Sequence, residues 1–170
     1  MDLVERARSF AADAYDDPAD LEHPLEVARL VRSAGLPAEV VAAAVLHDLI
    51  EDTAIDVAEI AGSFGSRVAA LVSTMTEDEG VSGYAHRKRE HRERAAAGGR
   101  DVAVIFVADK LSNARRMRSG KKKPAARKLA HYSATLEMMR ERYPGLPLLD
   151  DLERELSSLR LERYEQSSAP

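Results

Sequence analysis

The 170-residue sequence contains no cysteine and no tryptophan, and only 5% of its residues are aromatic. Without cysteine, disulfide bonds, thiolate zinc sites and cysteine nucleophiles are excluded. The shortage of aromatic rings argues against recognition of nucleic acid by base stacking. No apolar run approaches the roughly 20 residues needed to cross a bilayer, and the N-terminus lacks the basic-then-apolar pattern of a signal peptide. We therefore expect a cytoplasmic protein with no membrane partner.

The composition is that of an ordinary globular protein, with 45% hydrophobic and 32% charged residues and a net charge of −4. This balance gives no general reason to expect nucleic-acid binding. The length suits one compact domain and is short for two. We predict a single domain over residues 1–163 and a flexible tail at 164–170.

Apolar residues recur at helical spacing along nearly the whole chain, and β-branched alternation is almost absent. The pattern therefore predicts an all-α fold. Residues 102–108 alone could form a strand, but no turn residue follows them before residue 116, which favours a helix. The expected helices cover 3–14, 23–35, 37 into the motif at His47, 55–61, 68–74, 84–97, 102–116, 124–142 and 148–161.

The most informative motif is His47-Asp48, which follows a strongly apolar helical run and precedes a second acidic pair, Glu51-Asp52. In a helix, the second pair lies one turn beyond the first. Ionisable groups are expensive to bury in apolar surroundings without a partner. A divalent metal ion is the simplest such partner.

Two more positions complete a candidate metal site, namely His23 at a helix start and Asp109 inside the second strongly apolar helix. Together with His47 and Asp48 they offer two imidazoles and two carboxylates. Such a set suits Mn²⁺, Fe²⁺, Co²⁺, Ni²⁺ or Zn²⁺ and leaves positions open for water. Asn113 follows Asp109 by one turn and would line the same pocket.

The other histidines give weaker signals. His86 and His91 belong to a charged helix, and we expect both to be solvated. For His131 we expect a structural role.

These motifs resemble those of the HD-domain metal-dependent phosphohydrolases, whose signature is H…HD…D. The sequence is similar in particular to the hydrolase domain of the Rel/Spo alarmone enzymes and to the small stand-alone alarmone hydrolases. The resemblance runs from about residue 23 to residue 132. It rests on His23-Pro24, on the segment from His47 to Thr53, on the stretch 58–76 and on the segment from Val107 to Arg115.

The resemblance implies a single all-α HD-domain helical bundle that binds Mn²⁺ through His23, His47, Asp48 and Asp109. It further implies hydrolysis of the 3′-pyrophosphate of guanosine tetra- or pentaphosphate, a small phosphorylated nucleotide, with Glu51 and Asp52 assisting the attacking water. The substrate contacts implied or suggested are Asn113, Tyr132, Arg87, Lys88 and Arg115.

A basic cluster follows Asp109 and Asn113 directly, and it could neutralise substrate phosphates or form a solvated loop. Both interpretations stay open from the sequence. The cluster comprises Arg115, Arg116, Arg118, Lys121, Lys122, Lys123, Arg127 and Lys128.

One segment departs from the family pattern. Residues 10–22, just before His23, are acidic and contain no basic residue, whereas family members usually carry basic residues there that help to hold the guanine nucleotide. An anionic ligand is not attracted by such a segment. This leaves two alternatives open: an HD phosphohydrolase acting on another nucleotide, such as a nucleoside monophosphate or a phosphorylated dinucleotide cofactor, and a non-catalytic nucleotide- or partner-binding module. The intact ligand set argues against the second.

Overall fold

The computed structural model describes residues 1–120 and 125–168, and the described chain is helical without any strand. The all-α prediction is therefore confirmed. The elements are α1 (Leu3–Ala14), the short 3-10 helix η1 (Pro18–Leu21), α2 (Glu22–Ser33), α3 (Ala38–Leu46), α4 (Leu49–Asp52), α5 (Val57–Phe64), α6 (Ser66–Met75), α7 (Tyr84–Ala97), α8 (Arg100–Ser119), α9 (Ala126–Arg142) and α10 (Leu149–Ser168).

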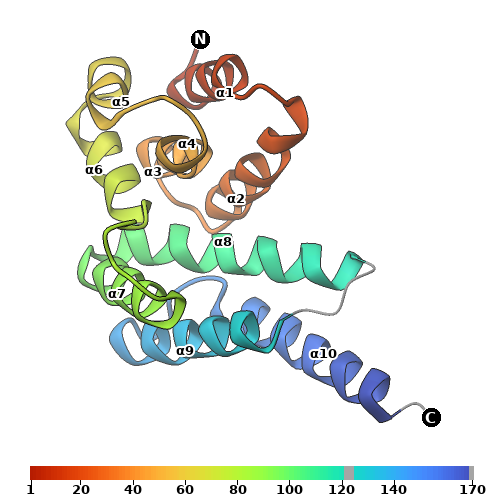
Figure 1. The fold of residues 1–170 in the computed structure, drawn as a ribbon. Coiled ribbons are helices and arrows are strands. Elements are labelled where there is room, and N and C mark those ends of the chain that lie inside the picture. Colours follow the sequence, from red (N-terminus) through yellow and green to blue (C-terminus); the bar gives the residue numbers. More distant parts are fainter. Residues whose placement is uncertain (121–124, 169–170) are drawn as a thin grey trace.

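Helix α8 forms the centre of the fold. In Figure 1 it crosses the molecule between an N-terminal group, α1 to α6, and a second group made of α7, α9 and α10. It packs against α2 on the first side and against α10 on the other. All residues from Val102 to Ser112 are buried, so this part of the helix has no face exposed to solvent. Burial on all sides explains why its sequence alone could also be interpreted as a strand.

Local capping signals set several helix ends. The Asp2 side chain accepts a hydrogen bond from the Glu5 backbone N–H at 2.9 Å and begins α1. At the start of α5, Asp56 and Glu59 form a reciprocal capping box. The structure gives α1 and α7 the bounds that the sequence predicted. No helix in residues 1–120 and 125–168 is both long enough and apolar enough to cross a membrane.

The third predicted helix is interrupted where the sequence analysis expected it to continue. Helix α3 ends at Leu46, and His47 and Asp48 form the junction with the one-turn helix α4. Both residues keep right-handed helical backbone angles, with φ of −61° and −95°. The motif therefore lies between two helices, on a backbone that is still nearly helical.

The last helix is longer than predicted. The sequence suggested an end at Leu161, whereas α10 continues to Ser168. The flexible tail expected at 164–170 stays a prediction. Residues 169–170 lie outside the described part of the chain.

Candidate functional site

His47 presents one ring nitrogen that is ready to bind a ligand. Its Nδ1 lies 2.9 Å from the Ala44 backbone oxygen, an acceptor, so Nδ1 carries the proton and Nε2 keeps its lone pair. That Nε2 is buried and makes no hydrogen bond with any residue in the described part of the chain. The nearest carboxylate oxygen, Asp48 Oδ1, lies 3.0 Å away. A fixed tautomer with a free Nε2 is the arrangement typical of a metal-binding histidine.

His23 and Asp109 approach this nitrogen from α2 and α8. The His23 Nε2 lies 3.0 Å from Asp109 Oδ1, and its Nδ1 lies 3.0 Å from Ser112 Oγ. The Asn113 side-chain amide donates to Asp109 Oδ1 at 2.6 Å. Each ligand candidate is thus oriented by a second side chain or a backbone group behind it.

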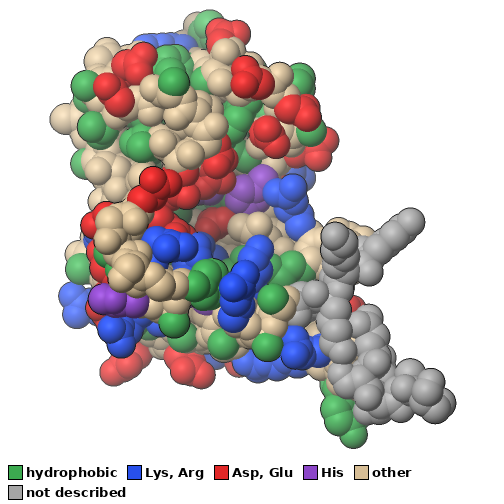
Figure 2. Space-filling model, viewed as in Figure 1, with side chains coloured by type: hydrophobic (Ala, Val, Ile, Leu, Met, Phe, Trp, Pro, Cys, Tyr) green, Lys and Arg blue, Asp and Glu red, His purple; other side chains and the backbone are tan. Residues whose placement is uncertain are grey.

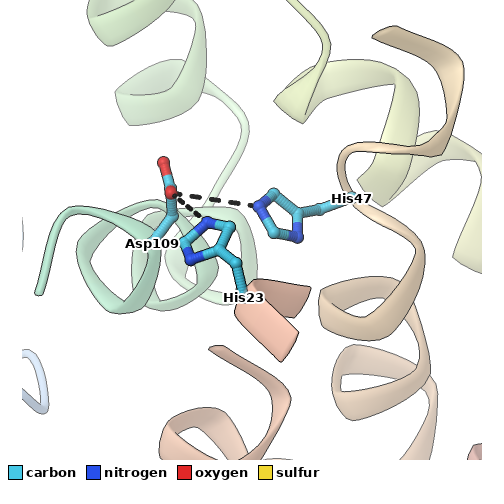
Figure 3. A group of neighbouring side chains, drawn as sticks. All are labelled: His23, His47 and Asp109. Carbon is cyan, nitrogen blue, oxygen red and sulfur yellow. Dashed lines mark hydrogen bonds and ion pairs between the residues drawn. The ribbon is translucent and has the colours of Figure 1, made fainter. Parts of the chain in front are cut away.

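The three side chains form a compact donor group, drawn in Figure 3. One donor atom each from His23, His47 and Asp109 lies within 4.8 Å of the other two, and all three residues are buried. Asp48 Oδ2 lies 3.7 Å from His23 Nε2, which places a second carboxylate at the edge of this group. Mixed imidazole and carboxylate donors, together with the unpartnered His47 Nε2, fit a divalent metal ion.

Asp109 is held in its charged form. Although burial opposes ionisation, the ammonium group of Lys110 and the hydrogen bond with His23 keep the pKa of Asp109 well below its usual value. The Lys110 Nζ contacts the outer oxygen, Oδ2, while Oδ1 faces the two histidines. An ionised carboxylate is the state that binds a metal ion.

This donor group lies in a pocket of about 250 Å³. Figure 2 shows acidic side chains along the upper edge of the cleft and basic ones along the lower edge. The acidic residues that line the pocket include Asp48 and Glu51, and the basic ones are Lys88, Lys110 and Lys128. The pocket therefore offers a metal-binding group and a positively charged wall within one cavity, which suits a phosphorylated ligand.

Glu51 is fixed at the mouth of the pocket. Its Oε1 accepts a hydrogen bond from the Glu77 backbone N–H at 2.6 Å. Desolvation by the pocket walls raises the pKa of the Glu51 carboxyl above its usual value, and the charge of Asp48 adds to this effect. A carboxylate with a raised pKa beside a metal-binding group is a candidate proton acceptor.

Asp52 lies close to the acidic segment that precedes the first ligand. Desolvation raises its pKa, and the negative charges of Asp48 and Asp20 raise it further. Asp20 belongs to η1, so the acidic segment lies beside the acidic side of the site. The buried hydroxyl of Tyr15 in the same segment has no hydrogen-bond partner, and burial raises its pKa.

The predicted substrate-contacting residues fall into two groups. Asn113, Tyr132 and Lys88 line the pocket. Arg87 does not line it and instead donates to the Glu77 carboxylate at 3.0 Å. Arg115 lies near two other acidic side chains, with Glu26 at 3.8 Å and Glu155 at 3.7 Å, so no contact places it in the pocket.

The members of the basic cluster that follows Asn113 also differ in whether they line the pocket. Arg118 pairs with Glu155 at 3.2 Å, whereas Lys128 lines the pocket. Arg127 lies over the ring of Tyr84, with 4.7 Å from its Cζ to the ring centroid. The predicted cluster members Lys121, Lys122 and Lys123 lie outside the described residues.

The expectation that His91 is solvated was wrong, while His86 is exposed as expected. His91 is only 3% exposed because it packs edge-on against Phe106 of α8, with ring centroids 4.9 Å apart. A signal for this existed in the sequence. Tyr84, Lys88 and His91 follow one another at spacings of four and three, so they share one face of α7, and all three line the pocket.

Glu77 was also missed, because it lies between the helices expected at 68–74 and 84–97 and belongs to no motif. Its carboxylate contacts Lys88 and Arg87 and lies 3.6 Å from His91 Nδ1. Its interactions with His91 and Lys88 hold the pKa of Glu77 well below its usual value. The backbone of Glu77 thus contacts the candidate base Glu51, and its side chain contacts the basic residues of α7.

Acid is expected to destabilise the protein through His131, which is buried as expected for a structural residue. Burial, aided by the cations of Lys110, Arg92 and Lys88, lowers the pKa of His131 from 6.5 to about 3, against the opposing charge of Asp109. Between these pH values the unfolded chain binds the proton and the folded chain does not. Stability is therefore complete above pH 6.5 and is lost as the pH falls, by about 2 kcal/mol at pH 5.

Urea unfolding at pH 7 and pH 5 tests this assignment. The variant His131→Gln should lose less stability than the wild type between the two pH values, by about 2 kcal/mol. His86→Gln serves as the matched control, because it is the same change at an exposed histidine, and should behave as the wild type. Equal losses in all three proteins would show that His131 is not the acid-sensitive group.

The family model and the similar curated proteins point to the same family. The model of the HD domain family matches residues 2–136 of the chain. Among curated proteins, the chain is 36% identical over 97 residues to "Guanosine-3′,5′-bis(diphosphate) 3′-pyrophosphohydrolase MESH1" of Danio rerio, covering 56% of this chain and 53% of that protein. The corresponding protein of Xenopus tropicalis is 34% identical over 123 residues, with coverages of 66% and 68%.

Longer relatives match only in part. A "Probable GTP pyrophosphokinase" of Mycobacterium leprae is 38% identical over 128 residues, which are 69% of this chain and 16% of that protein. The chain thus spans about half of the Danio rerio relative and a far smaller part of the Mycobacterium leprae one.

Two solved structures share the fold. The crystal structure of lmo0812 from Listeria monocytogenes EGD-e superposes with a TM-score of 0.73 at 33% identity, covering 81% of this chain and 98% of that one. A metazoan ortholog of SpoT, which hydrolyses ppGpp, superposes with a TM-score of 0.72 at 24% identity, with 96% of each chain covered.

Proposed function

The chain belongs to the HD-domain family, and on that premise we propose that it is a metal-dependent phosphohydrolase that removes the 3′-pyrophosphate of guanosine tetra- or pentaphosphate. Water attacks phosphorus, the bond to the 3′ oxygen breaks, and the products are pyrophosphate and GDP or GTP. The substrate is proposed from the names of the relatives, which describe this reaction for those proteins. A cytoplasmic location and a single domain over residues 1–163 stay predictions from the sequence.

One observation carries the proposal. The buried His47 Nε2 has no hydrogen-bond partner and faces a carboxylate and a second imidazole from two other helices. We propose that His23, His47, Asp48 and Asp109 hold a divalent ion such as Mn²⁺. When bound there, the ion supplies Lewis-acid polarisation of a phosphoryl oxygen and makes water more acidic.

The remaining chemistry is assigned to the side chains around this group. Glu51 is proposed as the proton acceptor, because its fixed carboxylate has a raised pKa and lines the pocket. Asp52 is proposed to orient the water. The positively charged wall that includes Lys88 is proposed to stabilise the negative charge that develops on the phosphoryl oxygens.

A second candidate function has its own observation. The charge of Asp20 contributes to the raised pKa of Asp52, so part of the acidic segment lies near the acidic residues beside the candidate site. A carboxylate there repels an anionic group of the substrate. This favours, as the alternative, hydrolysis of a nucleotide that presents fewer phosphates to this edge than guanosine tetraphosphate does.

The distinguishing experiment is incubation of the purified protein and Mn²⁺ with guanosine tetraphosphate, followed by ion-exchange chromatography. We expect GDP and pyrophosphate in equal amounts, and neither product after metal is removed with a chelator. Turnover of other nucleotides without turnover of guanosine tetraphosphate would replace the proposed substrate. No turnover of any phosphorylated nucleotide, in protein that contains metal, would favour the non-catalytic binding module.

A further inference from the structure

The inner wall of the pocket contains a buried hydrogen-bond donor that no described residue accepts. The Arg92 guanidinium donates to His131 Nδ1 at 2.8 Å, so this nitrogen is the unprotonated one. The proton of the neutral ring therefore sits on Nε2, which is buried and has no hydrogen-bond partner in the described part of the chain. A buried N–H of this kind is normally satisfied by an acceptor.

A second imidazole lies near the first. His91 and His131 pack against the ring of Phe106, with centroids at 4.9 Å and 6.4 Å, and both line the pocket. Within the described residues neither ring nitrogen of His91 makes a hydrogen bond, and Nδ1 lies 3.6 Å from the Glu77 carboxylate. The ammonium group of Lys110 lies 4.3 Å from the centroid of Phe106. Three polar groups of the pocket lining thus pack against the buried ring of Phe106.

Cationic side chains gather around these rings, beside the carboxylates of Asp109 and Glu77. Lys110 is paired with Asp109, and Lys88 with Glu77. Lys128 lies three residues before His131 on the pocket face of α9, and none of the ion pairs found among the described residues includes it. Lys128 is therefore the cation of this wall that can attract a phosphate group.

The position of this wall relative to the metal-binding group sets what it can bind. Phe106 and Asp109 are three residues apart on α8, which is about 4.5 Å along the helix axis. The wall around Phe106 therefore lies about one helical turn from the proposed metal ligand. Asp109 and His131 line the same pocket, and the charge of Asp109 reaches His131, so a pyrophosphate held at the metal-binding group can extend to this wall.

We propose that the imidazoles of His131 and His91, with the ammonium groups of Lys110 and Lys128, form a subsite for the terminal phosphate of a pyrophosphate group whose inner phosphorus lies at the metal-binding group. The inference rests on the proposed function, because it assigns the second phosphate of the same substrate. His131 donates through Nε2 to a phosphate oxygen. The subsite would make the protein selective for pyrophosphate esters over monophosphate esters.

The test compares two probes, inorganic pyrophosphate and orthophosphate, by calorimetric titration of the full chain with its metal. Orthophosphate occupies only the metal-binding end, whereas pyrophosphate also reaches the subsite. In His131→Phe, which keeps a ring against Phe106, we expect pyrophosphate binding to weaken about ten- to hundredfold. Orthophosphate binding should stay unchanged. His131→Gln, whose amide can donate from nearly the same place, should restore most of the difference.

The control is His86→Phe, the same change at an exposed histidine, which should leave both dissociation constants unchanged. An unchanged ratio of the two constants in His131→Phe would overturn the subsite, as would an equal weakening for both probes. These outcomes are independent of turnover. If His131→Phe loses the selectivity for pyrophosphate but the wild type does not hydrolyse guanosine tetraphosphate, the subsite is kept and the proposed substrate is rejected. If the wild type hydrolyses guanosine tetraphosphate but His131→Phe keeps the selectivity, the substrate is kept and the subsite is rejected.

Discussion

Replacement of Asp109 by asparagine is expected to remove the metal and the hydrolytic activity together. Asparagine keeps the shape of the side chain but not its charge, so the proposed site loses the buried carboxylate of the compact donor group and keeps only Asp48, at its edge, as an anionic ligand. A bound ion contributes several kcal/mol to stabilisation of the transition state, so activity should fall by at least about 10³-fold. Metal content is measured by mass spectrometry of the dialysed protein, and activity by chromatography of the products.

The fold has to survive this change for the result to be informative. Asp109 is 7% exposed and contacts Lys110, so its neutralisation leaves a buried ammonium group without its partner. Asparagine is therefore preferable to alanine, and thermal unfolding should accompany each assay. Asp101→Asn is the matched control, because Asp101 lies on the same helix and forms an ion pair with Arg67 at the surface. Full metal content in folded Asp109→Asn would show that the ligand assignment is wrong.

The helical fold could be predicted because its signals are local. Apolar spacing and capping residues act within a few positions of one another, and the bounds of α1 and α7 follow from them. The proposed ligands could be selected for the same reason. Asp109 directly follows the apolar run at residues 102–108, and His47 ends another apolar run, so each is conspicuous without knowledge of its neighbours in space.

The inner wall of the pocket could not be predicted in this way, because its properties arise between helices. The surroundings of His91 in sequence are charged, and its burial results from contact with Phe106 of α8. Likewise, Glu77 follows a helix end in a polar segment and has no local pattern. Its role depends on Glu51, 26 residues earlier, and on Arg87, ten residues later.

Replacement of Glu51 by glutamine is expected to lower activity by about 10²- to 10⁴-fold while leaving metal content unchanged. Glutamine cannot accept the proton of the attacking water, but its carbonyl oxygen can still accept the hydrogen bond from the Glu77 backbone N–H. The loop after α6 should therefore keep its place. Glu51 is not part of the compact donor group, which consists of His23, His47 and Asp109.

The comparison between the two variants separates binding from catalysis. If Glu51 acts as the proton acceptor, Glu51→Gln is inactive with metal and Asp109→Asn is inactive without it. Glu79→Gln, a change at an exposed residue in the same loop region as Glu77, should alter neither property. Loss of metal from Glu51→Gln would make Glu51 a ligand instead. Full activity with metal retained would move the role of proton acceptor to Asp52, because Asp52 is the other carboxylate near the site with a raised pKa.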